Sequence, residues 1–323
     1  MPYSTTMKAH LTLALLVCTL LGCDSSGKNE GPARQDAVRT VPSFDGEKAF
    51  EMLQAQTNLG PRNPGSAGHR ECRKLLASTL AQYADSIHLL PFAASVKGAT
   101  YYGTNIVARF GGTTTGRILL SAHWDTRPTA DEESDAKKRS MPILGANDGA
   151  SGVAVLLELA RLMAASPPPI GVDIVLFDLE DVGTSGVADS WSLGARDFAK
   201  NHLRKQDYSY AVNFDMIGDA RLEIRRERNS DISAASVLDR IFSTARLLGI
   251  SEFVDEPGHT VTDDHIPLIE AGLPAVNLID FDYPDASNSY WHTLQDTPDK
   301  CSPRSLGAVG AVIVQIIYAS KAS

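Results

Sequence analysis

The stretch Gly145-Ala146-Asn147-Asp148-Gly149-Ala150-Ser151-Gly152 decides how the rest of the chain is interpreted. It is a glycine-rich turn with one central carboxylate, Asp148. Residues 153–163 follow with apolar side chains dense enough for a helix that is buried on most sides, and residues 117–123 precede it as an apolar run ending in His123. An acid on a tight loop between a strand and a helix, near a histidine at a strand end, is where α/β proteins place their chemistry.

The hydrophobic pattern predicts helices alternating with strands. Helices are expected over residues 46–58, 69–83, 153–163, 193–201, 231–248, 265–271 and 305–320. Strands are expected over residues 89–96, 104–110, 119–123, 172–179, 211–217 and 274–279. The alternation predicts an α/β fold, a single domain with a central, mostly parallel (mixed) sheet and helices on both faces. The pattern contains no internal repeat and no second apolar nucleus that would indicate a further domain.

Composition is that of an ordinary globular protein. The chain has 323 residues, is 43% hydrophobic and 21% charged, and carries a formal net charge of −9. Acidity without a Lys/Arg stripe argues against nucleic acid as a partner. The basic run Arg225-Arg226-Glu227-Arg228 is interrupted by an acid and is typical of a solvated edge.

The first 44 residues are expected to precede the folded domain, residues 45–323. Residues 1–22 have the apolar core of an export signal, about a dozen residues long and therefore short of the roughly 20 that span a membrane. The sequence Leu20-Leu21-Gly22-Cys23 resembles the bacterial lipoprotein box, in which the cysteine is lipidated and becomes the first residue; simple secretion is the alternative. Residues 23–44 then form a flexible tether. A membrane-anchored lipoprotein on the periplasmic side is the expected location.

Acidic residues fall where an isolated charge is costly. They lie at strand ends or inside apolar segments, at Asp148, Glu180, Asp181, Asp215, Asp263 and Asp264. An unpaired buried carboxylate costs several kcal/mol, and strand ends of a parallel sheet converge on one edge, together with His123 and His292. A divalent cation there would neutralise the acids. Carboxylate and imidazole ligands without thiolate indicate zinc, with one open position in a catalytic site.

Each of these residues also has a simpler explanation when it is taken alone. Asp148 could cap the helix that follows it, and Asp264 could cap the next short helix. His123 could be a core histidine, Asp215 could bond to backbone amides, and Glu180-Asp181 could be a solvated strand end. All of these explanations would have to hold together in one sheet, so a metal site is favoured.

Six motifs, taken in chain order, carry a family resemblance. They are His123-Trp-Asp125, Gly145-Ala-Asn-Asp148, Phe177-Asp-Leu-Glu180-Asp181, Asn213-Phe-Asp215-Met-Ile-Gly, Thr262-Asp263-Asp264-His265-Ile-Pro and Trp291-His292-Thr. In this order they resemble the zinc aminopeptidase and glutaminyl cyclase superfamily over nearly all of residues 45–323. The Asp-Asp-His-Ile-Pro run, Trp291 directly before His292, and Trp191 resemble the glutaminyl cyclase branch. That branch converts the N-terminal glutamine of peptides and proteins into pyroglutamate with loss of ammonia.

The resemblance implies a role for each matching residue. Asp148, Asp181 and His292 would be the ligands of one Zn²⁺, and Glu180 would be the general acid/base, hydrogen-bonded by Asp263. The substrate-binding residues would be Trp191, Thr262 and Trp291. Supporting residues, or ligands of a second metal, would be His123, Asp125, Asp215 and His265. One departure is Asp181, where the family often has Glu; its shorter side chain can still ligate a cation.

Two other functions remain as alternatives. A two-zinc aminopeptidase would use His123, Asp148, Asp181, Asp215 and His292 as ligands, with Asp148 bridging and a glutamate activating water. The Trp-His pair, the second tryptophan and the Asp-Asp-His-Ile-Pro run favour the cyclase. A tethered, non-catalytic binding domain would be expected to lack ligands or the base, and this sequence retains them.

Cysteine content leaves the disulfide question open. The chain has 4 cysteines, of which Cys18 and Cys23 belong to the leader. Cys72 and Cys301 could form one bridge in an exported domain or remain separate buried thiols. The expected partners are peptides or proteins with an N-terminal Gln, and the membrane through lipidated Cys23. A monomer is favoured.

Overall fold

A computed structural model describes residues 41–112 and 115–320, which fall in one unit of the chain. The expected signal peptide, Cys23 and nearly all of the expected tether therefore lie outside the described residues. Among the residues that are described, no helix is both long enough and apolar enough to span a bilayer.

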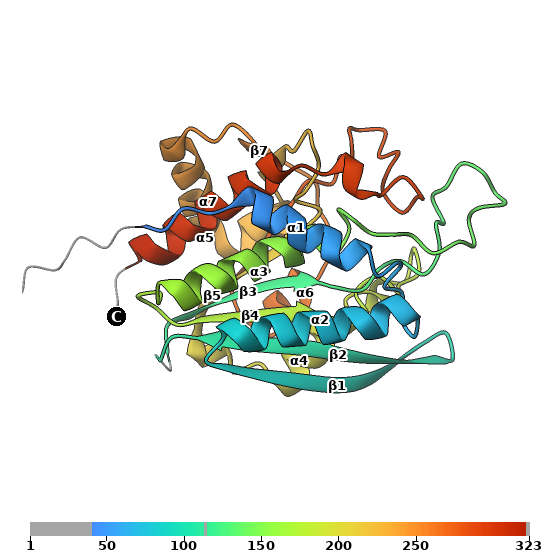
Figure 1. The fold of residues 1–323 in the computed structure, drawn as a ribbon, viewed down its shortest axis with the longest axis horizontal. Helices are drawn as coiled ribbons and strands as arrows, with labels where there is room; N and C mark the ends of the chain where they lie inside the picture. The colour runs from blue at the N-terminus through green and yellow to red at the C-terminus, as the bar shows by residue number, and fades with distance from the viewer. Residues whose placement is uncertain (1–40, 113–114, 321–323) are drawn as a thin grey trace, which may run out of the picture. The chain divides into compact units, whose positions relative to one another are not determined.

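A mixed, six-stranded sheet forms the centre of the molecule, in the order β1-β2-β4-β3-β5-β8 (Figure 1). Its strands are β1 (Ser86–Val96), β2 (Ala99–Phe110), β3 (Arg117–His123), β4 (Val172–Phe177), β5 (Tyr208–Asp215) and β8 (Ala275–Ile279). The β4-β3-β5-β8 part is parallel, and β1 and β2 form an antiparallel hairpin that pairs with β4. The expected mixed sheet is confirmed. The carboxyl ends of its four parallel strands meet at one edge.

Helices cover both faces of the sheet (Figure 1). One face carries α1 (Gly46–Thr57), α2 (Ala67–Tyr83), α3 (Ala150–Ala165), α5 (Arg228–Leu248) and α7 (Pro303–Ala319). The other face carries α4 (Leu193–Asn201) and α6 (His265–Glu270), which pack against each other and the sheet. Helices and strands thus agree with the expected elements, with ends shifted by a few residues.

Successive side chains of a strand point to opposite faces of the sheet, and in the central strands both sets of side chains are buried in a core. In β3, Ile118, Leu120 and Ala122 point into the larger core beneath α3 and α7, whereas Leu119 points into the smaller core beside α4 and α6. All residues of β3 are buried. A strand buried on both faces has a nearly continuous apolar run, and residues 117–123 approach this pattern, with Ser121 as the polar residue inside it.

The start of α3 fixes the glycine-rich turn against the sheet. Gly149, at the N-cap, has φ +96°, a left-handed conformation that glycine adopts without steric cost. Gly152 lies so close to the carbonyl of Phe214 in β5 that an added Cβ would overlap it. The Asp148 side chain does not cap α3, because no side chain makes that cap bond.

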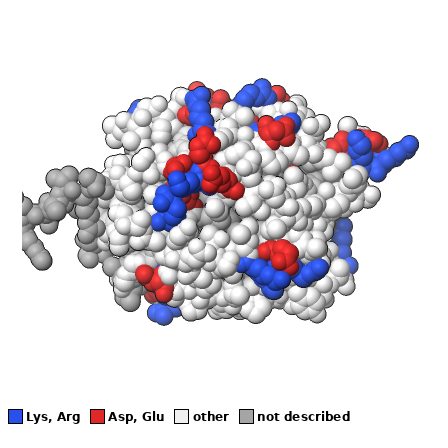
Figure 2. All heavy atoms as spheres, viewed as in Figure 1, with Lys and Arg blue, Asp and Glu red and all other residues white. Residues whose placement is uncertain are grey.

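A second, two-stranded sheet was not expected from the sequence. It pairs β6 (Ile224–Arg226) with β7 (Phe253–Pro257), segments too short for a clear period-two pattern. The basic run expected as a solvated edge lies here, and Arg226 is paired with Asp231, Asp239 and Asp255. The visible face in Figure 2 likewise shows Lys and Arg interspersed with acids.

The two cysteines of the domain do not form a disulfide. Cys72, on α2, and Cys301, before α7, are both buried free thiols. Of the two possibilities that the sequence left open, the structure has separate thiols.

Candidate metal centre and active site

A cavity of about 220 Å³ opens at the carboxyl edge of the parallel strands. Its polar lining includes Asp148, Glu180, Asp181, Asp215, Asp263 and His292. Asp148 stands on the turn before α3, the Glu180-Asp181 pair follows β4, and Asp215 ends β5. Residues far apart in the sequence therefore converge because neighbouring parallel strands end at this edge.

Asp148, Asp181 and His292 form one cluster of candidate metal ligands. His292 Nε2 lies 3.2 Å from Asp181 Oδ1 and 3.4 Å from Asp148 Oδ2. One donor atom from each of the three residues lies within 4.8 Å of the other two. The three side chains share a space that one cation can fill.

Buried polar atoms in this cluster fit a divalent cation. Both carboxylate oxygens of Asp181 are buried without a hydrogen-bond partner. Burial raises the pKa of Asp181, and the neighbouring Asp148 charge adds to the rise. Burial lowers the pKa of His292, but the nearby Asp181 and Asp148 outweigh it and raise the value to about 10. The carboxylates thus favour a positive charge between them, which a cation supplies while the imidazole stays neutral.

A second cluster shares Asp148 with the first. His123 Nε2 lies 3.1 Å from Asp148 Oδ1 and 3.2 Å from Asp215 Oδ1. These three residues also satisfy the geometry of a candidate cation site. Asp148 is placed to bridge two cations, so the geometry accommodates either one or two.

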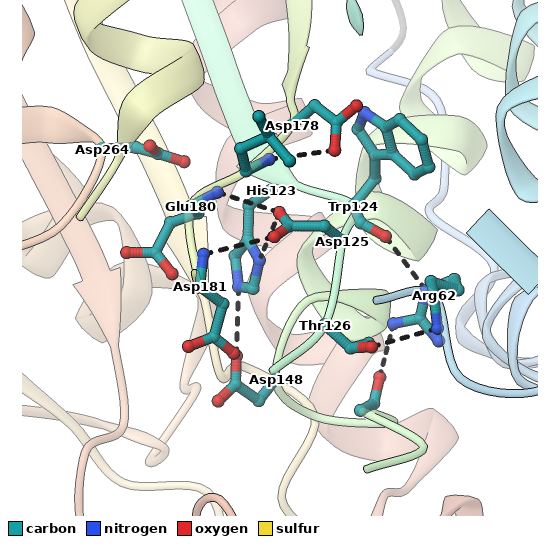
Figure 3. A network of polar contacts seen from close by, with 12 residues as sticks. Arg62, His123, Trp124, Asp125, Thr126, Asp148, Asp178, Glu180, Asp181 and Asp264 are labelled. Atoms are coloured by element: carbon teal, nitrogen blue, oxygen red, sulfur yellow. Dashed lines mark hydrogen bonds and ion pairs between the residues drawn. The ribbon is translucent and has the colours of Figure 1, made fainter. Parts of the chain in front are cut away.

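Two of the supporting candidates lie outside both clusters. Asp125 uses its carboxylate to accept hydrogen bonds from the backbone N–H of Glu180 at 3.0 Å and of Asp181 at 3.2 Å (Figure 3). His265 is fully buried on α6, and its Nε2 lies 3.3 Å from Glu227 Oε2. Asp125 therefore supports the Glu180-Asp181 segment, and His265 belongs to a separate ion pair. Neither is positioned as a second-metal ligand.

Glu180 lines the cavity and is buried, with 8% of its surface exposed. Burial raises its pKa well above the usual value, and the charges of Asp181 and Asp263 raise it further while His123 opposes them. The Ser192 hydroxyl lies 3.3 Å from Glu180 Oε1. A carboxylate with a raised pKa is suited to taking and returning a proton near neutral pH.

The expected hydrogen bond between Asp263 and Glu180 is corrected by the structure. Asp263 Oδ2 instead accepts from the side-chain amides of Asn213, at 3.1 Å, and Asn277, at 2.6 Å. Both amides donate to the same carboxylate oxygen of Asp263, which leaves that oxygen satisfied without Glu180. Asp263 acts on Glu180 through its charge.

A row of polar side chains crosses three parallel strands and ends at Asp263. Ser121 is paired in register with Asn213, and Asn213 with Asn277. Ser121 donates to Asn213 Oδ1 at 2.7 Å, and Asn213 Nδ2 lies 3.1 Å from Asn277 Oδ1. All of these side chains are fully buried. The row satisfies buried polar groups and holds Asp263 beside the cavity.

Aromatic side chains form the walls of the cavity. The Trp291 ring stacks on His292 with centroids 3.8 Å apart, and Phe281 packs on Trp291 at 5.4 Å. Trp191 lies nearly parallel to His292 at 6.3 Å. Thr262 lies in the lining as well. All three residues expected to bind substrate therefore line the cavity.

Some supporting residues were not identified from the sequence. Arg127 stacks over Trp191 at 4.8 Å and donates to the carbonyls of Asp181 and Gly183. Asp131 pairs with Arg127 and places its Oδ1 3.7 Å from His292 Nδ1. Both belong to residues 126–142, a stretch rich in charged residues that is typical of a surface loop. An Arg-Asp pair four residues apart, directly after the His-Trp-Asp motif, was the available signal.

Arg62 was also missed. It is fully buried and donates to the backbone carbonyls of Trp124, Leu144 and Gly145, holding both ends of the segment before Asp148 (Figure 3). It lies in the turn Pro61-Arg62-Asn63-Pro64-Gly65, where an arginine is usually solvent-exposed.

The backbone is left-handed at four non-glycine residues of the site, one of which is Ser192, with φ +55°. Leu179, directly before Glu180, has φ +60°; Met216, directly after Asp215, has φ +49°; and His292 itself has φ +52°. Such conformations cost of order 1 kcal/mol or more each and persist where the surrounding structure enforces them.

The chain belongs to Peptidase family M28, whose sequence profile matches residues 105–317. It is similar to the solved glutaminyl cyclase of Bacteroides thetaiotaomicron, at 33% identity and TM-score 0.84, over 87% of this chain and 100% of that one. A Zn-dependent exopeptidase from Parabacteroides distasonis matches at 34% identity and TM-score 0.83 over the same shares. The glutaminyl-peptide cyclotransferase-like protein of Mus musculus is 25% identical, covering 78% of this chain and 70% of that protein.

Proposed function

We propose that the protein is a zinc-dependent glutaminyl-peptide cyclotransferase, which closes the N-terminal glutamine of peptides or proteins to pyroglutamate and releases ammonia. The observation that carries the proposal is the placement of Glu180 beside the Asp148-Asp181-His292 cluster in a cavity walled by Trp191 and Trp291. Its similarity to solved glutaminyl cyclases supports the same activity.

The donor set fits zinc, which Asp148, Asp181 and His292 would hold. When bound, this cation polarises the side-chain amide of the substrate glutamine. Asp181 is a departure from the Glu often found here, and its position 3.2 Å from His292 Nε2 is compatible with the ligand role.

Glu180 is the group that moves the proton. The substrate α-amine attacks the carbon of its own side-chain amide, so a C–N bond forms to close the five-membered ring. Glu180 accepts a proton from that amine and returns it to the amide nitrogen, which leaves as ammonia when its C–N bond breaks. No protein nucleophile is needed, because the substrate supplies its own.

The walls of the cavity favour ring closure over hydrolysis. Trp191, Trp291 and Phe281 provide apolar surface against which the glutamine side chain can curl toward its own amine. Holding amine and amide in contact contributes several kcal/mol of the barrier reduction. The same surface keeps water away from the amide.

A two-zinc aminopeptidase is the second candidate. The observation that favours it is the His123-Asp148-Asp215 cluster, which shares Asp148 with the first site. In that enzyme Glu180 would take a proton from water, and the peptide bond after the N-terminal residue would be hydrolysed. The similarity to a Zn-dependent exopeptidase supports this alternative.

Zinc stoichiometry measured together with ammonia release from a Gln-terminated dipeptide tests the proposal. One zinc per chain with stoichiometric ammonia and pyroglutamate is expected, and Glu180→Gln should lower turnover by about 10²–10⁴-fold while zinc and fold are retained. Release of leucine from Leu-naphthylamide without pyroglutamate from Gln-naphthylamide, at two zincs per chain, would establish the peptidase instead. Unchanged turnover in Glu180→Gln would show that Glu180 is not the proton-transfer group, and no turnover of either substrate by the wild type would favour a binding domain.

The activity is proposed to be outside the cytoplasm. The leader resembles a lipoprotein signal, so Cys23 is the proposed lipid anchor and the periplasmic side of the membrane the proposed location, with the chain acting as a monomer. Cys23→Ala should move the protein from the membrane fraction to the soluble fraction. A variant that stays in the membrane fraction would rule out this anchor.

A further inference from the structure

One buried residue, Asp296, is bonded to consecutive peptide groups of the turn that carries Asp148. Its carboxylate oxygens accept hydrogen bonds from the N–H of Asn147, at 2.8 Å, and of Asp148, at 3.1 Å. Its backbone carbonyl accepts from the N–H of Ala146 at 3.4 Å. Asp296 is fully buried, so water does not compete for these bonds.

The turn around Asp148 depends on such external partners. It runs between Gly145, φ +63°, and Gly149, φ +96°, and therefore has neither helical nor strand geometry. Peptide groups in such a turn are not satisfied by a regular ladder, so another segment has to bind them. The carboxylate of Asp296 does this at the peptide of Asp148 itself.

Asp296 also belongs to the loop that supplies the imidazole. It follows His292 by four residues in the sequence. The hydroxyl of the buried Tyr283 donates to Asp296 Oδ1 at 2.9 Å and orients the carboxylate. One side chain thus connects the loop of His292 to the turn of Asp148.

The other acidic ligand has an equivalent support. Asp125 accepts from the N–H of Glu180 and of Asp181, two consecutive residues ending at the ligand, as Asp296 does from Asn147 and Asp148. In both cases a carboxylate from a different segment binds the peptide of the ligand and the peptide before it. The same arrangement at both acids indicates that the backbone of each ligand is held in position by a carboxylate from another segment.

We propose that Asp296 is a positioning residue of the metal centre, which sets the separation of the Asp148 carboxylate and the His292 imidazole by binding the peptides of residues 147 and 148. The role concerns the cation site and does not depend on whether the substrate is cyclised or hydrolysed. If the wild-type protein released no ammonia from a Gln-terminated peptide, the proposed function would be refuted but this inference would stand.

Asp296→Asn tests the proposal with little change of shape. The new NH₂ group cannot accept a peptide hydrogen bond, so one of the two carboxylate bonds is lost. We expect the zinc dissociation constant, measured by competition with a chromogenic chelator, to rise about 10–100-fold. The visible absorption bands of the Co²⁺-substituted protein should shift as well, which reports ligand geometry without substrate.

Asp280→Asn is the matched control. Asp280 is another buried acid that accepts a backbone N–H bond, from Glu223 at 2.8 Å, but it does not contact the turn of Asp148. Its zinc affinity and Co²⁺ spectrum should equal those of the wild type.

A second variant keeps the test decisive if Asp296→Asn does not fold. Tyr283→Phe removes only the hydroxyl that orients Asp296, so zinc affinity should fall about threefold, in the same direction and by less than in Asp296→Asn. Wild-type zinc affinity and an unchanged Co²⁺ spectrum in the folded variants would overturn the proposal, even if the melting temperature fell, because that result would leave Asp296 a purely structural residue.

Discussion

The side-chain amide of Asn277 donates to Asp263 at 2.6 Å, and this bond ends the polar row that begins at Ser121 in β3. The charge of Asp263 raises the pKa of Glu180. The interior of the sheet thereby influences the proposed acid/base through a chain of neutral amides. Residues without any contact to substrate are expected to affect turnover.

Asn277→Ala should remove the nearer of the two side-chain amides that donate to Asp263. The buried carboxylate of Asp263 would lose a hydrogen-bond donor, and an unsatisfied buried group of this kind costs about 1–3 kcal/mol of stability. Asp263 would also be held less firmly beside Glu180. We expect stability to fall by that amount and kcat to fall about tenfold, with KM changed less. Ser121→Ala, at the far end of the row, is the control and should have a smaller effect on kcat. Equal effects of the two variants would argue against transmission along the row.

Gly183→Ala should displace the Trp191 indole. A Cβ at position 183 would overlap the indole ring of Trp191. The guanidinium of Arg127 stacks on that ring and restricts its movement. We expect KM for a Gln-terminated dipeptide to rise about tenfold, equivalent to about 1.4 kcal/mol of binding, while bound zinc stays constant. Gly112→Ala, where an added Cβ meets open space, should leave KM unchanged. An unchanged KM in Gly183→Ala would mean that Trp191 does not contact the substrate.

His292→Ala and Asp215→Ala separate one cation from two. His292 belongs only to the first cluster, so its loss should remove zinc and activity together. Asp215 belongs only to the second cluster, so its loss should leave one zinc in a cyclase and reduce two zincs to one in a peptidase. The metal content of each variant, measured by mass spectrometry after dialysis, distinguishes one zinc per chain from two. Full zinc occupancy in His292→Ala would contradict its role as a ligand.

Asp280 should make the stability of the domain depend on pH. Burial raises its pKa to about 7, with backbone bonds from Glu223 and Asp282 opposing the rise. Because the folded pKa exceeds the unfolded value, its stabilising contribution is complete below about pH 4 and is lost as pH rises toward about 7.

Asp280→Asn removes this contribution. The advantage of the wild type over the variant in free energy of unfolding should shrink with rising pH, by at most about 1.4 kcal/mol per pH unit. Urea unfolding at about pH 5 and about pH 8 measures it. The same difference between wild type and variant at both pH values would show that Asp280 does not titrate in this range.

The sequence was sufficient for the architecture because its strands are buried on both faces. Residues 117–123 and 172–177 are mostly apolar and buried throughout, the first ends in His123 and the second is followed by Asp178, and that pattern locates the carboxyl edge. Several acids at buried strand ends are typical of a cation site, so Asp148 and Asp181 could be identified as candidate ligands from the sequence. The short strands β6 and β7 lacked enough residues for any periodic signal.

Supporting residues were harder to predict because their partners are backbone groups. Arg62 and Asp296 bind peptide carbonyls and N–H groups of the Asp148 turn. Which backbone groups are left unpaired is known only once the chain is folded, so neither residue differs in the sequence from an exposed one. The expected Asp263–Glu180 bond was wrong for a related reason, since Asn213 and Asn277 are brought beside Asp263 only by strand register.

The left-handed backbone at Leu179, Met216 and His292 has a consequence for thermal inactivation of the protein. A left-handed backbone is unfavourable for these residues, and a bound cation would help to hold them in that conformation. Mild warming should therefore release the metal before the sheet melts, so inactivation would precede loss of circular dichroism. Relatives adapted to hot environments would need extra bracing at the loops of the site more than a larger core.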